Sequence, residues 1–120
     1  MSGTAAAGDG PFTHVIADLS GVGAPALRDS TSLMGLLIAA AGAAGFSTVG
    51  APVVRQLPDG GVAAVLFLDA CHITLRTLPE QQTLLLDILA PATRDAQKAL
   101  DVFTRRLAPK KLRSETRTRG

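Results

Sequence analysis

Short runs rich in apolar and β-branched residues recur along the chain, each bounded by turn-forming residues, and this pattern predicts β-strands. Gly50 and Pro52 fall inside one of these runs and indicate an edge strand or a bulge there. Pro58-Asp59-Gly60-Gly61 is typical of a hairpin turn. Weak alternation around Leu112 allows a short last strand. The predicted strands are Thr13 to Leu19, Ser47 to Leu57, Val62 to Leu68, His72 to Leu78 and Leu84 to Leu89.

Two other segments repeat apolar residues at the spacing of a helix face. The first runs from about Thr31 to Ala44, with Ser30, Thr31 or Ser32 as its cap and Gly45 at its end. The second follows Thr93 as its cap and terminates at Pro109. Gly21 to Pro25 reads as a turn. The predicted apolar faces are Leu33, Leu37 and Ala41 with Met34 and Ile38 beside them, and then Ala96, Leu100, Phe103 and Leu107.

The predicted order is β-α-β-β-β-β-α, with an optional last strand. Consecutive strands joined by short turns require an antiparallel sheet, and two helices can cover only one face of it. The fold class is therefore α+β, and the second face needs another partner. We expect a flexible N-terminal tail over 1–11, a single domain over 12–109 and a basic C-terminal tail over 110–120.

Composition narrows the class of protein. The chain has 120 residues, 47% of them hydrophobic and 18% charged, which is ordinary for a globular domain. Its single cysteine, Cys71, excludes an intramolecular disulfide and fits a reducing, cytoplasmic setting. Residues 1–11 lack the pattern of a secretory signal, and the apolar segment from Leu33 to Phe46 is too short to span a bilayer. We expect no membrane partner and no metal site.

The net charge is only +2, but cations crowd the C-terminal end. No aromatic residue interleaves with them, so base stacking is unsupported and nucleic-acid binding is disfavoured. A solvated helix end followed by a frayed segment explains the cluster equally well. The cluster is Arg105, Arg106, Lys110, Lys111, Arg113, Arg117 and Arg119.

The segment from Asp69 to Glu80, Asp-Ala-Cys-His-Ile-Thr-Leu-Arg-Thr-Leu-Pro-Glu, resembles the self-cleaving strand of the prokaryotic S-adenosylmethionine decarboxylase proenzymes. Three further segments are similar to that family in the right order, and the resemblance covers roughly Thr13 to Gly120. It implies the family's fold, in which two sheets pack face to face in a homodimer. The matching framework positions are His72, Thr74, Thr77, Pro79 and Glu80, and the further segments are His14 to Leu19, Gly60 to Val62 and Asp87 to Leu89.

The resemblance also implies which positions carry the family's chemistry. There a serine hydroxyl attacks the preceding peptide carbonyl, and the chain breaks to leave a pyruvoyl group that serves as the electron sink for decarboxylation. In this chain Cys71 stands at the cleaved serine and Arg76, which cannot accept a proton, at the processing histidine. Cys71 and Arg76 are the two candidate catalytic residues. Because both differ from the residues that the family uses, processing and decarboxylation should be very slow. The remaining replacements are Ala70 for a glutamate, Ala63 for a helper serine and Pro91 for the catalytic cysteine.

The expected ligand pocket comprises Leu57, Ala63, Asp69, Leu78 and Pro91. Leucines stand where the family stacks adenine on aromatic rings, so they either favour an apolar ligand or simply fill the site.

Both catalytic candidates also have structural interpretations. Cys71 is either a nucleophile or a small buried hydrophobe. Adjacent strand residues point to opposite faces, so His72 should point away from the face that Cys71 shares with Asp69 and Ile73. Arg76 either pairs with Asp87 or Glu80, or holds a ligand carboxylate or enolate.

Three functions remain open. The favoured hypothesis is an uncleaved, homodimeric, repurposed scaffold without a cofactor, which binds a small, largely apolar molecule. Whether it catalyses a reaction is left open, and if it is an enzyme, a cyclase or isomerase of secondary metabolism is the expected class. The second is a decarboxylase of S-adenosylmethionine or another amino acid, with a pyruvoyl group formed by cleavage between Ala70 and Cys71. The third is an inactive paralogue that heterodimerises with an active enzyme.

Overall fold

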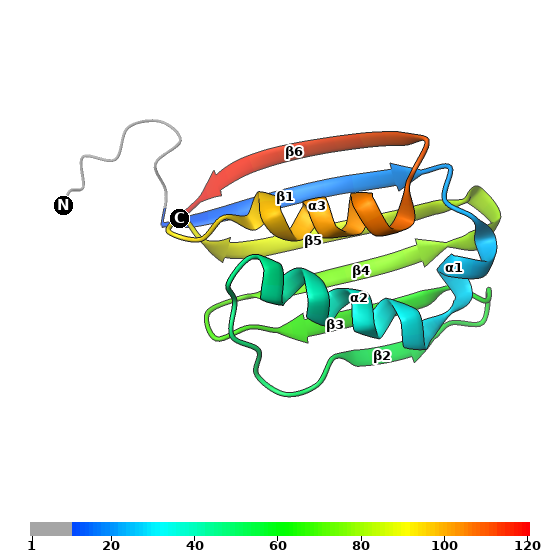
Figure 1. The fold of residues 1–120 in the computed structure, drawn as a ribbon, viewed down its shortest axis with the longest axis horizontal. Helices are drawn as coiled ribbons and strands as arrows, with labels where there is room; N and C mark the ends of the chain where they lie inside the picture. Colours follow the sequence, from blue (N-terminus) through cyan, green and yellow to red (C-terminus); the bar gives the residue numbers. More distant parts are fainter. Residues whose placement is uncertain (1–10) are drawn as a thin grey trace.

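A computed structural model describes residues 11–120 (Figure 1), so the predicted N-terminal tail lies, except for Pro11, outside the described residues. Six strands form one fully antiparallel sheet in the order β2-β3-β4-β5-β1-β6, which confirms the α+β class. The strands are β1 (Phe12–Ser20), β2 (Val53–Gln56), β3 (Val62–Phe67), β4 (His72–Leu78), β5 (Thr83–Pro91) and β6 (Lys111–Arg119). The helices are α1 (Ala24–Arg28), α2 (Ser30–Ala43), α3 (Ala96–Leu107) and the 3₁₀ turn η1 (Pro79–Gln81).

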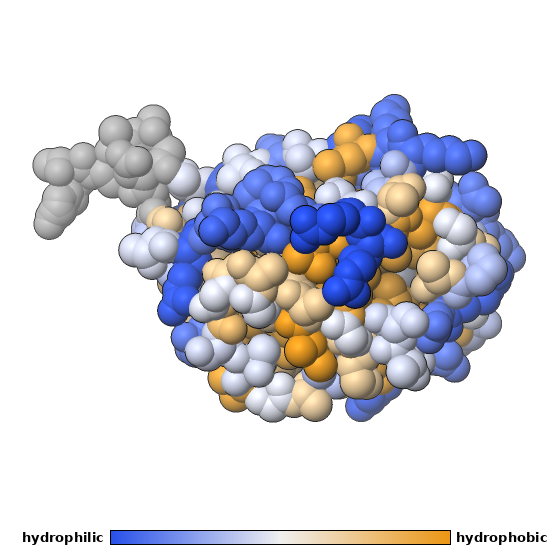
Figure 2. Space-filling model, viewed as in Figure 1, coloured by the Kyte–Doolittle hydropathy of each residue, from blue (hydrophilic) through white to orange (hydrophobic). Residues whose placement is uncertain are grey.

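The longer helices, α2 and α3, lie on the same face of the sheet, as predicted (Figure 1). The apolar face of α3 is confirmed, with Phe103 fully buried. On α2 the buried face is turned slightly from the prediction, because Leu36 and Ala40 are buried while Ile38 is 49% exposed. Figure 2 views this side and shows strongly hydrophilic residues over α3, with paler and more hydrophobic ones over α2.

Aspartates cap both helices, instead of the predicted hydroxyl residues. The carboxylate of Asp29 accepts hydrogen bonds from the Ser32 N–H at 3.1 Å and the Ser32 hydroxyl at 2.7 Å. Asp95 likewise accepts from the Gln97 N–H at 3.1 Å. Both aspartates directly precede the first helical turn, where a carboxylate also meets the positive end of the helix dipole.

The C-terminal segment differs most from the prediction. Residues 110–120 were expected to form a basic tail, but Lys111–Arg119 is a nine-residue strand paired with β1 along its whole length. Every side chain of β6 is exposed, so its stability comes from the backbone ladder and not from an apolar face. A strand that buries neither face carries little apolar alternation, which is why the pattern allowed only a short strand around Leu112.

Two connections also differ from the prediction. The predicted turn at Gly21 to Pro25 runs into α1, which is followed directly by α2. The predicted strand from Ser47 to Leu57 is reduced to β2, preceded by an isolated bridge between Thr48 and Leu68. Gly50 has φ of 77°, a backbone conformation that interrupts the strand.

The sheet face opposite the helices, called the open face below, has no covering element within residues 11–120. Its side chains alternate with the buried core residues along each strand and are mostly half-buried. Register places Val65, Thr74 and Asp87 in one row across the face. The next row holds Ala63, Arg76 and Leu85.

Candidate functional site

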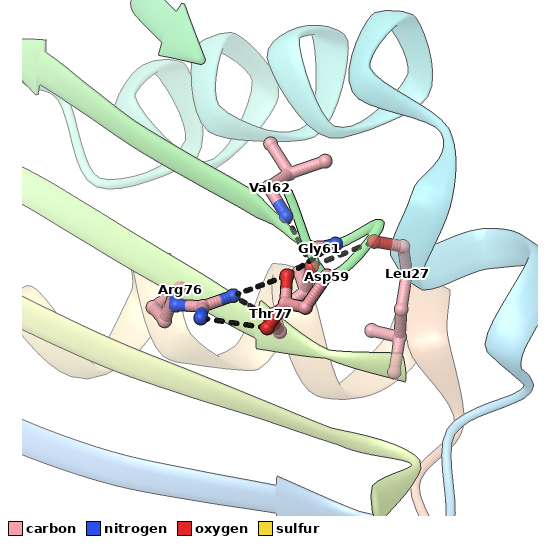
Figure 3. Close-up of polar contacts among 6 residues, drawn as sticks. All are labelled: Leu27, Asp59, Gly61, Val62, Arg76 and Thr77. Carbon is pink, nitrogen blue, oxygen red and sulfur yellow. Dashed lines mark hydrogen bonds and ion pairs between the residues drawn. The ribbon is translucent and has the colours of Figure 1, made fainter. Parts of the chain in front are cut away.

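Arg76 lies on the open face of β4 and is bound to the neighbouring hairpin turn (Figure 3). Its Nη2 is 2.9 Å from the Oδ2 atom of Asp59, and its Nη1 donates to the carbonyl of Thr77 at 2.7 Å. The predicted partners Asp87 and Glu80 were therefore wrong. Asp59 sits in the turn between β2 and β3, and only the folded hairpin brings it to β4.

Asp59 is held as a carboxylate by this arrangement. The hydrogen bond from Arg76 lowers the pKa of Asp59, and the N–H of Gly61, at 2.8 Å, lowers it further. A Cβ atom on Gly61 would meet the Arg76 guanidinium and come within 2.5 Å of the Thr77 carbonyl oxygen. The turn therefore requires glycine at this position. The sequence identified the turn but not this contact.

Thr77 joins this cluster to α1 from the buried side of β4 (Figure 3). Its side chain is fully buried. The hydroxyl accepts from the Val62 N–H at 2.8 Å and donates to the Leu27 carbonyl at 2.7 Å. Thr77 was one of the framework positions of the family resemblance, and its role is to fix β3, β4 and α1 together.

A shallow hollow of about 310 Å³ lies on the open face over β2, β3 and β4. Ala63 is the one predicted pocket residue that lines it. Leu57 and Leu78 lie toward the same end of the sheet, since Leu57 closes the β2–β3 hairpin onto Gly61 and Leu78 ends β4. The full lining is Val53, Arg55, Ala63, Ala64, Val65, Thr74 and Leu75.

The other predicted residues lie at the opposite end of the sheet. Asp69 and Ala70 form a tight turn between β3 and β4, closed by a 2.8 Å hydrogen bond from the Leu68 N–H to the Cys71 carbonyl. Cys71 and Arg76 are five residues apart along a strand, or about 16 Å. Pro91 ends β5 at this same end. The structure thus separates the two catalytic candidates.

The Cys71 thiol is in an environment that disfavours its thiolate. It is partly buried, and burial raises its pKa, with the nearby Asp69 carboxylate raising it further. Asp69 in turn lies 3.8 Å from Arg94. No hydrogen bond reaches the Cys71 sulfur from any residue between 11 and 120. His72 starts β4 on the open face while Ile73 is buried, so strand alternation holds from that point.

A second polar cluster on the open face was not among the predicted site residues. The Nε2 atom of His14 is 3.0 Å from the Oδ1 atom of Asp87, and its Nδ1 atom is 3.2 Å from the Arg119 guanidinium. Both His14 and Asp87 belong to segments that carry the family resemblance, and this was the signal in the sequence that could have pointed to them. Asp87 is thereby engaged with His14 and is not the partner of Arg76.

The chain combines an antiparallel sheet carrying two long helices on one face with a β3–β4 turn whose sequence resembles the family's self-cleaving strand. Both features are typical of S-adenosylmethionine decarboxylase-like proteins. The crystal structure of the adenosylmethionine decarboxylase from Aquifex aeolicus is similar to this chain, with a TM-score of 0.84 and 27% sequence identity. The match covers 92% of each chain. The sequence model described as S-adenosylmethionine decarboxylase matches residues 13–120. The chain belongs to this family, and the resemblance stated above is confirmed.

No curated protein matches this sequence. Within residues 11–120 no helix combines the length and apolar character that a membrane crossing needs. The same residues place no group of three or more His, Cys, Asp or Glu side chains where a metal ion could be held.

Proposed function

We propose that this chain stays whole between Ala70 and Cys71 and binds a small, largely apolar molecule in the hollow on its open face. The observation that carries the proposal is the surroundings of Cys71. Self-processing needs an activated nucleophile, and the thiol reacts as its thiolate. No group within residues 11–120 forms a hydrogen bond with the Cys71 sulfur to take its proton, and burial and the Asp69 carboxylate raise the pKa of the thiol.

The other residues do not fit a pyruvoyl group formed by self-processing. Arg76 cannot take up a proton, and its guanidinium is already bound to Asp59 and to the Thr77 carbonyl. Ala63 offers no hydroxyl, and Pro91 has neither a thiol nor an N–H group. We therefore derive no reaction step through such a group.

The hollow supports the binding part of the proposal. Its volume of about 310 Å³ lies near the lower end of small-molecule sites, which span about 300–1,000 Å³. Val53, Val65 and Ala63 give it apolar walls, and no aromatic ring lines it for a purine to stack on. A cofactor-free cyclisation or isomerisation, promoted by holding a flexible substrate in one shape, is the reaction class that such a site suits.

A homodimer packed through the open face would close this hollow. The hollow is shallow in one subunit, and exposed apolar side chains lie on the same face, with Phe67 49% and Val53 41% exposed. Covering them would remove apolar surface from water, which favours association. We propose that the open face is where the second copy packs.

Intact-mass measurement of the purified protein tests the main proposal. We expect one species of 12.3 kDa that borohydride leaves unchanged. The matched variants are Cys71→Ser, which restores a hydroxyl at the cleavage position, and Cys71→Ala, which removes any nucleophile. Two fragments separated between Ala70 and Cys71 in the wild type, absent in Cys71→Ala and carrying a reducible ketone, would refute it.

A pyruvoyl-dependent decarboxylase remains the second candidate function. Membership of the family and the 27% identity to a decarboxylase favour it. It requires the cleavage that the mass measurement detects, so the same experiment decides between the two functions. Carbon dioxide release from S-adenosylmethionine by the cleaved fraction would establish it.

A further inference from the structure

The hollow on the open face is apolar except at two places. Register places Arg55 beside Ala63, so its side chain projects from the same face at the edge strand β2. Thr74 stands on β4 in the row of Val53 and Val65. The hollow therefore has a hydrocarbon floor, a guanidinium at its outer edge and a hydroxyl toward the centre of the sheet.

Arg55 is the charged residue that lines the hollow, and within residues 11–120 no carboxylate lies within 4.0 Å of its guanidinium. Its Nη1 atom donates to the neighbouring Val54 carbonyl at 2.9 Å, and this is a bond to a neutral group. Among residues 11–120 the arginines within 4.0 Å of a carboxylate are Arg76, Arg94, Arg113 and Arg117. The remaining donors of the Arg55 fork are thus available to an anion.

The sequence suggested Arg76 as the group that would hold a ligand anion. The structure assigns it elsewhere, because Asp59 neutralises its charge and the Thr77 carbonyl takes another of its donors. Arg55 is the register neighbour of Ala63 on the side away from Arg76. The position next to the hollow that can balance a negative charge is therefore on β2 and not on β4.

We infer that the hollow takes an apolar molecule carrying one carboxylate. The carboxylate binds the Arg55 fork, and the hydrocarbon body lies over Ala63 and Val65. An arginine and a carboxylate match in geometry and can form two parallel hydrogen bonds. The Thr74 hydroxyl makes no hydrogen bond within residues 11–120 and can bond a second polar atom of the ligand. This inference rests on the proposed binding function and names its ligand class.

The test compares two probes of equal length, octanoate and octanamide, on the uncleaved full-length protein. Binding is followed by backbone amide NMR shifts, which locate each probe and give its Kd. We expect octanoate to bind about tenfold more tightly than octanamide, a difference of about 1.4 kcal/mol. Shifts should centre on Ala63, Val65 and Thr74.

Three variants assign the effect to the guanidinium. Arg55→Gln should weaken octanoate about tenfold and leave octanamide unchanged. Arg55→Lys should restore part of the loss, because it keeps the charge without the fork. Arg105→Gln, an exposed arginine of α3 on the helix side, is the matched control and should change neither probe.

The possible results distinguish a failure of this inference from a failure of the proposed binding function. If octanamide binds the hollow as tightly as octanoate, or Arg55→Gln changes nothing, the carboxylate preference is wrong and the apolar site stands. If neither probe shifts the amides of the hollow at millimolar concentration, both the ligand class and the proposed binding site are wrong.

Discussion

Thr77 should be a point of high sensitivity to substitution, because its hydroxyl satisfies two buried backbone groups at once. It accepts from the Val62 N–H and donates to the Leu27 carbonyl. Thr77→Val keeps the volume of the side chain and removes the hydroxyl, so no cavity forms and both backbone groups lose their partner. An unsatisfied buried polar group costs about 1–3 kcal/mol.

Two such groups together cost about 2–6 kcal/mol, and we expect a loss of about 3 kcal/mol in the free energy of unfolding. Unfolding entropy is about 2.1 cal/mol/K per residue, so for this 120-residue chain the loss corresponds to a fall of about 12 °C in Tm. Urea unfolding followed by circular dichroism measures it, and the m-value should stay constant if only stability changes.

Thr77→Ser is the matched control. It keeps both hydrogen bonds and loses one methyl group, at a cost of about 1 kcal/mol. The reasoning fails if Thr77→Val is as stable as Thr77→Ser, since that order would mean that burial of the methyl group, and not the hydroxyl, holds β3, β4 and α1 together.

Four further predictions follow from the contacts described. Gly61→Ala should destabilise the fold because its Cβ meets the Thr77 carbonyl; Gly35→Ala on α2, where a Cβ has open space, should instead be neutral or stabilising in the same urea assay. The rate of Cys71 alkylation by iodoacetamide should reach half of its maximum at a higher pH than the rate for N-acetylcysteine, because the pKa of the thiol is raised. Asp69→Asn should lower this midpoint pH, and a wild-type midpoint below that of N-acetylcysteine would contradict the raised pKa. Because the folded-state pKa of Asp59 is lowered, the stability it contributes should be present above the unfolded value of 3.8 and lost as pH falls through the lower folded value. Asp59→Asn should therefore lower stability at neutral pH and make less difference in strong acid, and an equal loss at both would count against the pair with Arg76. Light scattering should give a dimer that Phe67→Asp dissociates and Ile38→Asp, equally exposed on the helix side, does not; a monomeric wild type would exclude packing through the open face.

The sequence alone was sufficient to predict the elements that bury one face. Along β4, Ile73 and Leu75 are buried and alternate with the half-buried Thr74 and Arg76, and α3 buries its apolar face as expected. Burial on one side repeats every two residues in a strand and every three or four in a helix, so the pattern of apolar residues records it directly. The predicted strands end at Leu68 and resume at His72, and the structure places the Ala70–Cys71 bond in the turn between them.

Features of the fold and of the site that leave no such periodicity in the sequence were decided only by the tertiary structure. The strand β6 is exposed on both faces, so only weak alternation around Leu112 separates it from a solvated tail, and its full length is seen only in its pairing with β1. Arg76 bonds to Asp59, seventeen residues away, because the β2–β3 hairpin folds over the end of β4. The hollow beside Arg55 depends equally on register, which sets the neighbours of each side chain across the sheet. The sequence could propose groups able to bind or react, but the distances between them exist only once the strands are paired.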